Sequence, residues 1–216
     1  GGLVMKIGTT IRNMGAGATR EIILSCANRA EAIELDHIWV VDHIAIPPKE
    51  SEGSDGIWLD PLAVLAFLAA VTKRIQIGVS VLVLPYRPAL PTAKWVASIQ
   101  ELSEGRLLLG VGPGWMASEY KILGVDKRQR GKITDEVVDF IYRCFESTDD
   151  IVSLNGQEFL FRPKPKRPPI YVGGMTEAAL KRVVRCGEGW IPVGLDPEKI
   201  RPLAHRLKEL TEQAQK

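Results

Sequence analysis

His43 is the side chain of this 216-residue chain whose type and place best suit proton transfer. It follows a short apolar segment, Ile38 to Val41, that is typical of a buried strand, so we expect it at the carboxyl end of that strand. An imidazole exchanges a proton near neutral pH, and the carboxylate of the adjacent Asp42 could orient the ring or bias its charge. A histidine that merely bonds a loop carbonyl is the alternative. We therefore take His43 and Asp42 as candidate catalytic residues.

A glycine-rich turn offers a second place for chemistry. In the stretch Arg106-Leu-Leu-Leu-Gly-Val-Gly-Pro-Gly-Trp115, an apolar segment too short for a helix leads directly into this turn. Such a strand must be covered on both faces, as in a parallel sheet, and ligands of parallel α/β folds lie at the carboxyl ends of the strands. Glycines at 110, 112 and 114 would let the backbone approach a bound molecule. A tight strand-to-helix turn without a ligand explains the same residues, and the spacing lacks a Walker or dinucleotide fingerprint.

The turn Gly173-Gly174-Met175-Thr176 is a third candidate, because it precedes an expected helix over 177–185. Free backbone amides at a helix start attract anions, the glycines allow close approach and the Thr176 hydroxyl can help. The turn therefore suits a phosphate or another anion. An ordinary capped turn is the alternative.

Other polar and aromatic residues are less specific. Trp58 and Trp115 fall in expected loops at the same end as His43, where they could form a wall for an aromatic ligand, although core packing is the commoner role of tryptophan. Arg130-Gly131 and Asp135-Glu136 could brace a loop over the site, but we interpret them as a solvated helix face. No metal motif, paired-carboxylate spacing or Ser-His-Asp order stands out.

The elements that must position these residues alternate between short apolar segments and helical patterns, which is typical of βαβ units. Helices should begin at Thr19, Asp60-Pro61 and Asp196-Pro197, because each start offers a capping side chain. Asn155-Gly156 predicts an inserted hairpin outside the main sheet. The expected strands are Met5–Thr9, Ile38–Val41, Ile75–Leu84, a segment from Leu107, Ile170–Val172 and Gly189–Val193.

This alternation gives six βα units and an α/β fold. A closed (β/α)₈ barrel usually needs about 250 residues and eight strands, so the barrel is short by two units. Its open edges would need to be covered by the hairpin, a loop or a second subunit. We expect residues 1–4 to be an expression remnant and residues 5–216 to form a single domain.

Composition restricts the function classes. The net charge of +2 argues against a nucleic-acid surface, and the apolar segments are too short to span a membrane. Three widely spaced cysteines in helical patterns favour a reduced, cytoplasmic protein with buried thiols over disulfides or a metal site.

Taken in order, several segments resemble the bacterial luciferase-like family of flavin- and deazaflavin-dependent oxidoreductases. Single motifs are unspecific, but their order and spacing cover nearly the whole chain. The segments are Ile38-Trp-Val-Val-Asp-His43, Asp60-Pro61, Ile75-Gln-Ile-Gly78, Val81-Leu-Val-Leu-Pro-Tyr-Arg-Pro88, Leu102-Ser-Glu-Gly-Arg-Leu-Leu-Leu-Gly-Val-Gly-Pro-Gly-Trp115, Arg130-Gly131 with Asp135-Glu136, and Ile170-Tyr-Val-Gly-Gly174.

The resemblance implies a TIM-barrel scaffold with a cofactor across the carboxyl ends of its strands. It implies that His43 matches the family's catalytic or cofactor-contacting histidine, and that Gly173, Gly174 and Thr176 match its phosphate-binding turn. Ser80-Val81 resembles the position of a non-proline cis peptide behind the isoalloxazine ring. Together with Gly112 and Gly114, these residues are the expected cofactor-binding positions.

The subgroup that the chain resembles most implies coenzyme F420 and hydride transfer to or from a small organic substrate, and the family resemblance implies a homodimer. We expect no nucleic-acid or membrane partner. An FMN-dependent monooxygenase that uses reduced flavin and oxygen is the alternative. A cofactor-binding or vestigial protein without turnover is another, because two units are missing. The chain has Pro113 and Trp115 where related FMN enzymes can carry Arg and sugar-phosphate dehydrogenases carry Glu.

Overall fold

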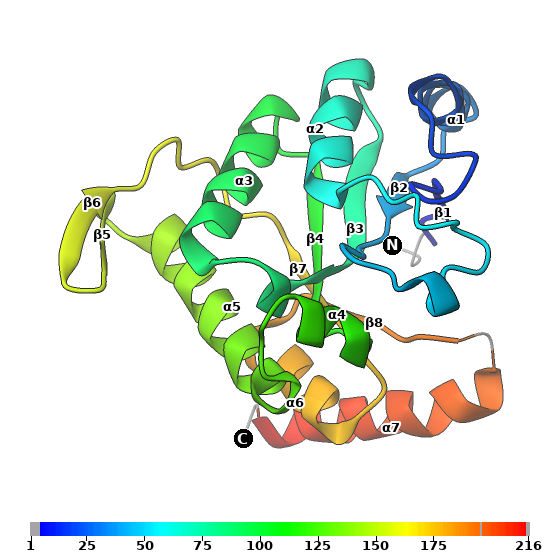
Figure 1. Ribbon diagram of the computed structural model, residues 1–216. Coiled ribbons are helices and arrows are strands. Elements are labelled where there is room, and N and C mark those ends of the chain that lie inside the picture. The colour runs from blue at the N-terminus through cyan, green and yellow to red at the C-terminus, as the bar shows by residue number, and fades with distance from the viewer. Residues whose placement is uncertain (1–4, 195, 215–216) are drawn as a thin grey trace.

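A curled parallel sheet of six strands forms half of a barrel in the computed structural model, which describes residues 5–194 and 196–214 (Figure 1). The proposed remnant at residues 1–4 lies outside these ranges. Every neighbouring pair in the sheet is parallel. The strand order is β1 (Gly8–Thr10), β2 (His37–Val40), β3 (Gln76–Val83), β4 (Leu107–Gly112), β7 (Ile170–Gly173) and β8 (Gly189–Ile191).

Helices cover the convex side of this sheet, and the predicted alternation of six βα units is confirmed (Figure 1). The predicted hairpin is confirmed as β5 (Ile151–Leu154) and β6 (Gln157–Leu160), an antiparallel pair outside the main sheet. The helices are α1 (Arg20–Ala32), α2 (Pro61–Val71), α3 (Ala89–Leu102), α4 (Ala117–Ile122), α5 (Arg130–Glu146), α6 (Glu177–Cys186) and α7 (Pro197–Ala214), with 3-10 turns η1 (Pro48–Glu50), η2 (Leu84–Tyr86) and η3 (Lys127–Gln129).

Capping side chains start the helices where the sequence predicts. Thr19 accepts a hydrogen bond from the amide of Ile22 at the start of α1, and Asp60 accepts from Leu62 at the start of α2. The outer strands are shorter than predicted: β1 begins at Gly8 and β8 ends at Ile191. The residues cut off are mostly exposed to solvent.

The two faces of the sheet differ in burial. Ile38, Val40, Ile77 and Val79 point toward the helices and are fully buried in the main core. The concave face instead carries half-buried aromatic rings, with Trp39 and Tyr171 edge to face at 5.9 Å between ring centroids. The helices thus bury one side of the sheet, while the other lines the hollow of the half-barrel.

The cysteines correct one prediction. Cys144 and Cys186 are buried, but Cys26 is exposed, because it lies on the side of α1 away from the core. All three thiols are free. No helix within residues 5–194 and 196–214 combines the length and apolar character needed to cross a membrane.

Gly110→Ala is expected to lower the free energy of unfolding by about 3 kcal/mol. The added methyl group would collide with backbone atoms, and a change of side-chain rotamer cannot relieve such a collision. A Cβ atom at position 110 would lie 2.1 Å from the carbonyl oxygen of Val79 on the neighbouring strand. Gly17→Ala is the matched control, since nothing lies within 4 Å of a Cβ there. Urea denaturation measures both variants. Equal stability of the two would contradict the close approach of β3 and β4.

Candidate active site

A cavity of about 410 Å³ lies at the carboxyl ends of the strands, where the sequence predicts a ligand. The predicted site residues that line it are Asp42, His43, Ser80, Val81, Gly112, Gly114, Gly173 and Gly174. Thr176 does not line it. Its hydroxyl caps α6 by accepting a hydrogen bond from the amide of Ala179 at 3.3 Å. The structure therefore brings together four chain segments that are far apart in the sequence.

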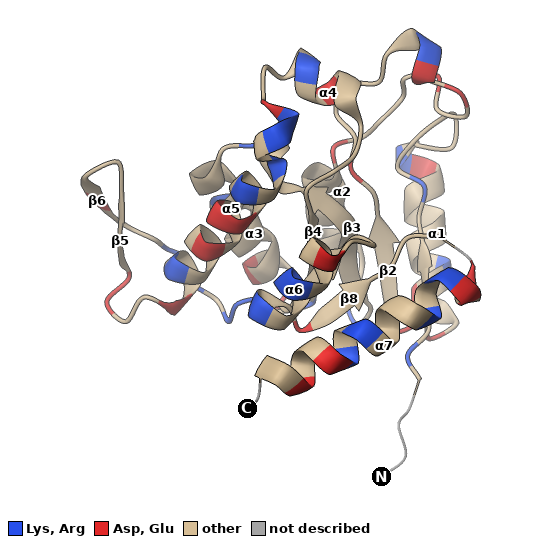
Figure 2. Cartoon of the chain, turned by 90° about the horizontal axis from the view of Figure 1, so that it is seen from below, with Lys and Arg blue, Asp and Glu red and all other residues tan. Residues whose placement is uncertain are grey.

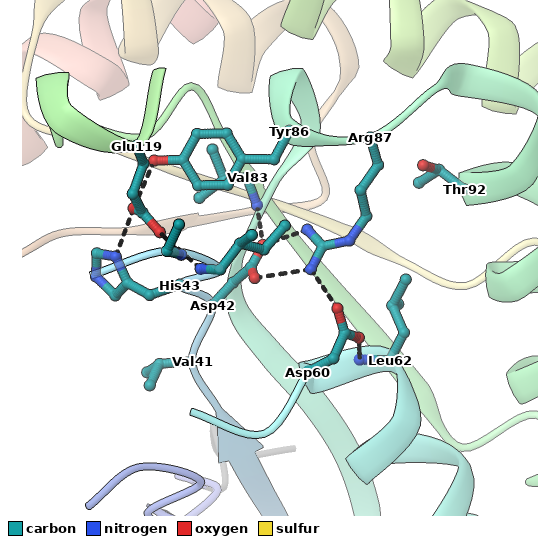
Figure 3. Close-up of polar contacts among 12 residues, drawn as sticks. Val41, Asp42, His43, Asp60, Leu62, Val83, Tyr86, Arg87, Thr92 and Glu119 are labelled. Atoms are coloured by element: carbon teal, nitrogen blue, oxygen red, sulfur yellow. Dashed lines mark hydrogen bonds and ion pairs between the residues drawn. The ribbon is translucent and has the colours of Figure 1, made fainter. Parts of the chain in front are cut away.

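Glu119 on α4 binds the imidazole of His43 (Figure 3). Its Oε2 lies 2.7 Å from Nδ1 of His43 and accepts a hydrogen bond from the Tyr86 hydroxyl at 2.8 Å. Its Oε1 accepts from the backbone amides of Ile44 at 2.6 Å and Ala45 at 3.0 Å. The glutamate is 0% exposed. Because water does not reach its carboxylate, these four donors stabilise the negative charge.

This set of donors keeps Glu119 ionised. Burial alone would raise its pKa, but hydrogen bonds from His43, the two loop amides and Tyr86 lower the pKa of Glu119 to about 2. Burial raises the pKa of Tyr86, and the hydrogen bond to Glu119 raises it further. The Tyr86 hydroxyl therefore keeps its proton and donates. An ionised carboxylate is only an acceptor, so Nδ1 of His43 must carry the proton in this contact.

Sequence reasoning missed Glu119 as a functional residue. The available signal was a carboxylate within the short helix that follows the glycine-rich turn at the same end of the sheet as His43. Its 76-residue separation from His43 gave no local pattern to detect.

The expectation that Asp42 orients His43 is wrong. The Asp42 carboxylate instead binds Arg87 through two contacts of 2.6 and 2.9 Å and accepts a hydrogen bond from the amide of Val83 at 2.9 Å. Arg87 also contacts Asp60 at 2.7 Å (Figure 3). Successive side chains of an extended segment point in opposite directions, so Asp42 and His43 turn to different partners. Asp42 thereby ties the end of β3 to the start of α2.

A cis peptide bond joins Ser80 and Val81, as the family resemblance predicts. The pairing register of β3 with β4 shifts between Val79 and Leu82, at the same place. The Val81 side chain occupies the space where side chains at two glycines would stand. Added Cβ atoms at Gly112 and Gly173 would lie 2.7 and 2.5 Å from its methyl groups. These glycines therefore make room for Val81.

The substitutions Gly173→Ala and Val81→Ala are expected to be coupled. Gly173→Ala alone should lower the free energy of unfolding by about 2 kcal/mol, because it crowds Val81. In the Val81→Ala background the crowding methyl is gone, so the added cost should fall by about 1 kcal/mol or more. A double-mutant cycle in urea measures this coupling. Simple additivity of the two losses would contradict the contact.

Salt bridges join α6, the helix that follows the second glycine turn, to α5. Both helices carry acidic and basic positions (Figure 2). Arg182 of α6 is only 7% exposed and binds Asp135 of α5 at 2.7 Å, and Arg185 binds Asp135 and Asp139. The interpretation of Asp135 as part of a solvated face is therefore wrong, because it braces α6. Glu136 does face solvent, where it pairs with Lys132.

Two tryptophans flank His43 at the cavity, as their predicted loops place them. Their ring centroids lie 4.6 Å (Trp58) and 6.0 Å (Trp115) from that of His43, both in edge-on geometry. Trp115 is 67% exposed, which is unusual for so large an apolar side chain. It therefore presents an aromatic surface at the mouth of the cavity.

Comparison with known sequences identifies similar proteins. A family model described as "Luciferase-like monooxygenase" matches residues 5–216. An uncharacterized protein of Mycobacterium bovis is 33% identical over 208 residues, which cover 88% of this chain and 71% of that protein. An F420-dependent glucose-6-phosphate dehydrogenase of Amycolatopsis mediterranei is 32% identical over 180 residues, which cover 78% of this chain and 52% of that protein.

Solved structures share the fold. An F420-dependent secondary alcohol dehydrogenase in complex with an F420-acetone adduct matches with a TM-score of 0.81 and 22% identity, over 99% of this chain and 66% of the other. The oxygenating constituent of 3,6-diketocamphane monooxygenase from Pseudomonas putida, in complex with FMN, matches with a TM-score of 0.79 and 14% identity, over 98% and 63%. The chain thus spans about two thirds of the length of these structural neighbours.

Proposed function

Because this chain belongs to the luciferase-like monooxygenase family, we propose that it is an oxidoreductase that transfers hydride between coenzyme F420 and a small organic substrate. Relatives at 31 to 32% identity are named for F420-dependent chemistry, which supports this choice of coenzyme. The observation that carries the proposal is the His43 imidazole, which Glu119 holds by one nitrogen at the edge of a cavity.

The residues present fit a flat tricyclic ring. The cavity walls are largely apolar, and Gly112, Gly173 and Gly174 contribute bare backbone to them. Gly174 has a φ of +128°, which favours glycine, and its carbonyl accepts a hydrogen bond from the Trp190 indole at 2.7 Å. Ser80 and Val81 would lie behind the ring. The start of α6, with Thr176 at its cap, would hold a phosphate.

The coenzyme, when bound, would supply the hydride chemistry, and the chain would manage the proton. With Nδ1–H of His43 donating a hydrogen bond to Glu119, the neutral ring offers the lone pair of Nε2. That nitrogen can take a proton from a substrate hydroxyl or, once protonated, return it to a carbonyl oxygen. Glu119 stabilises the imidazolium that forms in between. A homodimer stays a prediction.

Equilibrium titration with F420 and, separately, with FMN tests the proposal. We expect F420 to bind more tightly than FMN. Gly174→Ala should weaken this binding, while Gly156→Ala in the hairpin turn, another glycine of positive φ, should not. Tight binding of FMN without F420 would favour the monooxygenase. Binding of neither would favour a protein without turnover.

A further inference from the structure

The charges around the cavity give no partner for an anionic substrate. Among the residues that the structure describes, no lysine or arginine lines it, and its charged or titratable groups are Asp42, His43 and Tyr86. The guanidinium of Arg87, which contacts the lining residue Asp42, already binds the carboxylates of Asp42 and Asp60. A substrate phosphate or carboxylate placed beside His43, away from the start of α6, would lose water without gaining a cation, which is costly.

His43 presents one polar atom to a ligand. Its Nδ1 donates to Glu119, while within residues 5–194 and 196–214 no protein atom is hydrogen-bonded to its Nε2. The His43 side chain is 18% exposed, so this end of the ring remains accessible. A lone pair in such a place favours a hydroxyl donor. When a hydroxyl compound gives up hydride from carbon to the oxidised coenzyme, its oxygen must release a proton, and Nε2 can take it.

Aromatic and aliphatic side chains line the cavity beside His43. Trp58 and Trp115 stand edge-on to the His43 ring, and Val41, Ile191 and Val193 complete the walls. Tryptophan faces bind flat apolar groups well, and Trp115 has most of its surface free to do so. The body of a substrate would thus meet apolar contacts on several sides.

We infer that the substrate is a neutral alcohol, or the matching carbonyl compound, whose oxygen meets Nε2 of His43 and whose flat apolar body lies against Trp58 and Trp115. This inference rests on the proposed function. It separates this chain from its relatives named for glucose 6-phosphate, whose substrate carries a phosphate.

Two probes of similar shape, one neutral and one anionic, test the inference. They are 4-methylbenzyl alcohol and 4-(hydroxymethyl)benzoate, with glucose 6-phosphate as a third ligand. Saturation-transfer NMR on the protein without coenzyme should detect the neutral alcohol and not the anions. With F420 bound, kcat/KM for the neutral alcohol should exceed that for the carboxylate by about 100-fold. Equal or tighter binding of either anion would overturn the inference.

Variants separate the walls from the charge. Trp115→Ala should raise KM for 4-methylbenzyl alcohol about tenfold and raise KM for 2-propanol, which has no flat body, by much less. Trp95→Ala is the matched control, because this exposed tryptophan lies on α3 and does not line the cavity. Val193→Lys should raise kcat/KM for the carboxylate probe by about tenfold, because it adds a positive charge to the cavity wall. Equal effects of Trp115→Ala on both alcohols, or no gain from Val193→Lys, would count against the assigned walls.

The two proposals can fail separately. If F420 does not bind while the NMR preference for the neutral probe persists, the proposed function is wrong and the cavity preference stands. If F420 binds and an anion is preferred, the coenzyme assignment stands and the substrate class is wrong.

Discussion

His43→Ala is expected to lower kcat for the F420-dependent reaction by about 10² to 10⁴-fold, the usual contribution of a positioned acid or base. The affinity for F420 should change little, because the imidazole transfers a proton and does not hold the coenzyme. Steady-state kinetics and coenzyme titration on the same preparation measure both quantities. Added imidazole should restore part of the lost rate, since a small molecule can replace the missing ring.

The control for this prediction is His205→Ala, which removes an exposed histidine on α7. It should leave kcat and coenzyme affinity as they are. If His43→Ala keeps full turnover, the imidazole does not carry the proton. If instead it abolishes F420 binding, its role is to hold the coenzyme.

Glu119→Gln is expected to lower kcat by about 10 to 100-fold, as loss of a group that orients a catalytic histidine commonly does. A neutral amide cannot balance the positive charge of an imidazolium. If its NH₂ group faces Nδ1–H of His43, two donors oppose each other and no hydrogen bond forms. The free energy of unfolding should also fall by about 1 to 3 kcal/mol, because buried donors lose their acceptor. Kinetics as a function of pH and urea denaturation check both effects.

The same variant has a distinctive pH dependence. The pKa of Glu119 falls from 4.5 to about 2 on folding, so the folded state binds fewer protons than the unfolded state between these values. The stability from this group is complete above pH 4.5 and is lost as the pH falls toward 2. Glu119→Gln should therefore lose less stability than the parent between pH 5 and about 2.5.

Glu136→Gln is the matched control for Glu119→Gln, because Glu136 is exposed and makes only a solvated pair with Lys132. Its unfolding should follow that of the parent at each pH. If Glu119→Gln and Glu136→Gln show the same acid profile and the same kcat, the buried contact with His43 has no functional weight. Isotope-edited NMR of the His43 ring gives an independent check, since the parent should hold its proton on Nδ1.

Local patterns allowed much of the architecture to be predicted from the sequence. The caps at Thr19 and Asp60, the Asn-Gly hairpin and the alternation of strands and helices depend on neighbours a few residues away. The carboxyl ends of parallel strands share one edge, so the sequence also placed His43 and the glycine turns at one cavity.

The sequence by itself determined which segments meet, and only the tertiary structure decided which side chains touch. Asp42 is adjacent to His43 in the chain, yet Glu119, 76 residues away, holds the ring. Strand alternation turns Asp42 toward Arg87, and α4 brings Glu119 over the end of β2. Likewise, Val81 fills the space at Gly112 and Gly173 because three strands converge there. Such contacts follow from packing in space, which spacing along the chain does not encode.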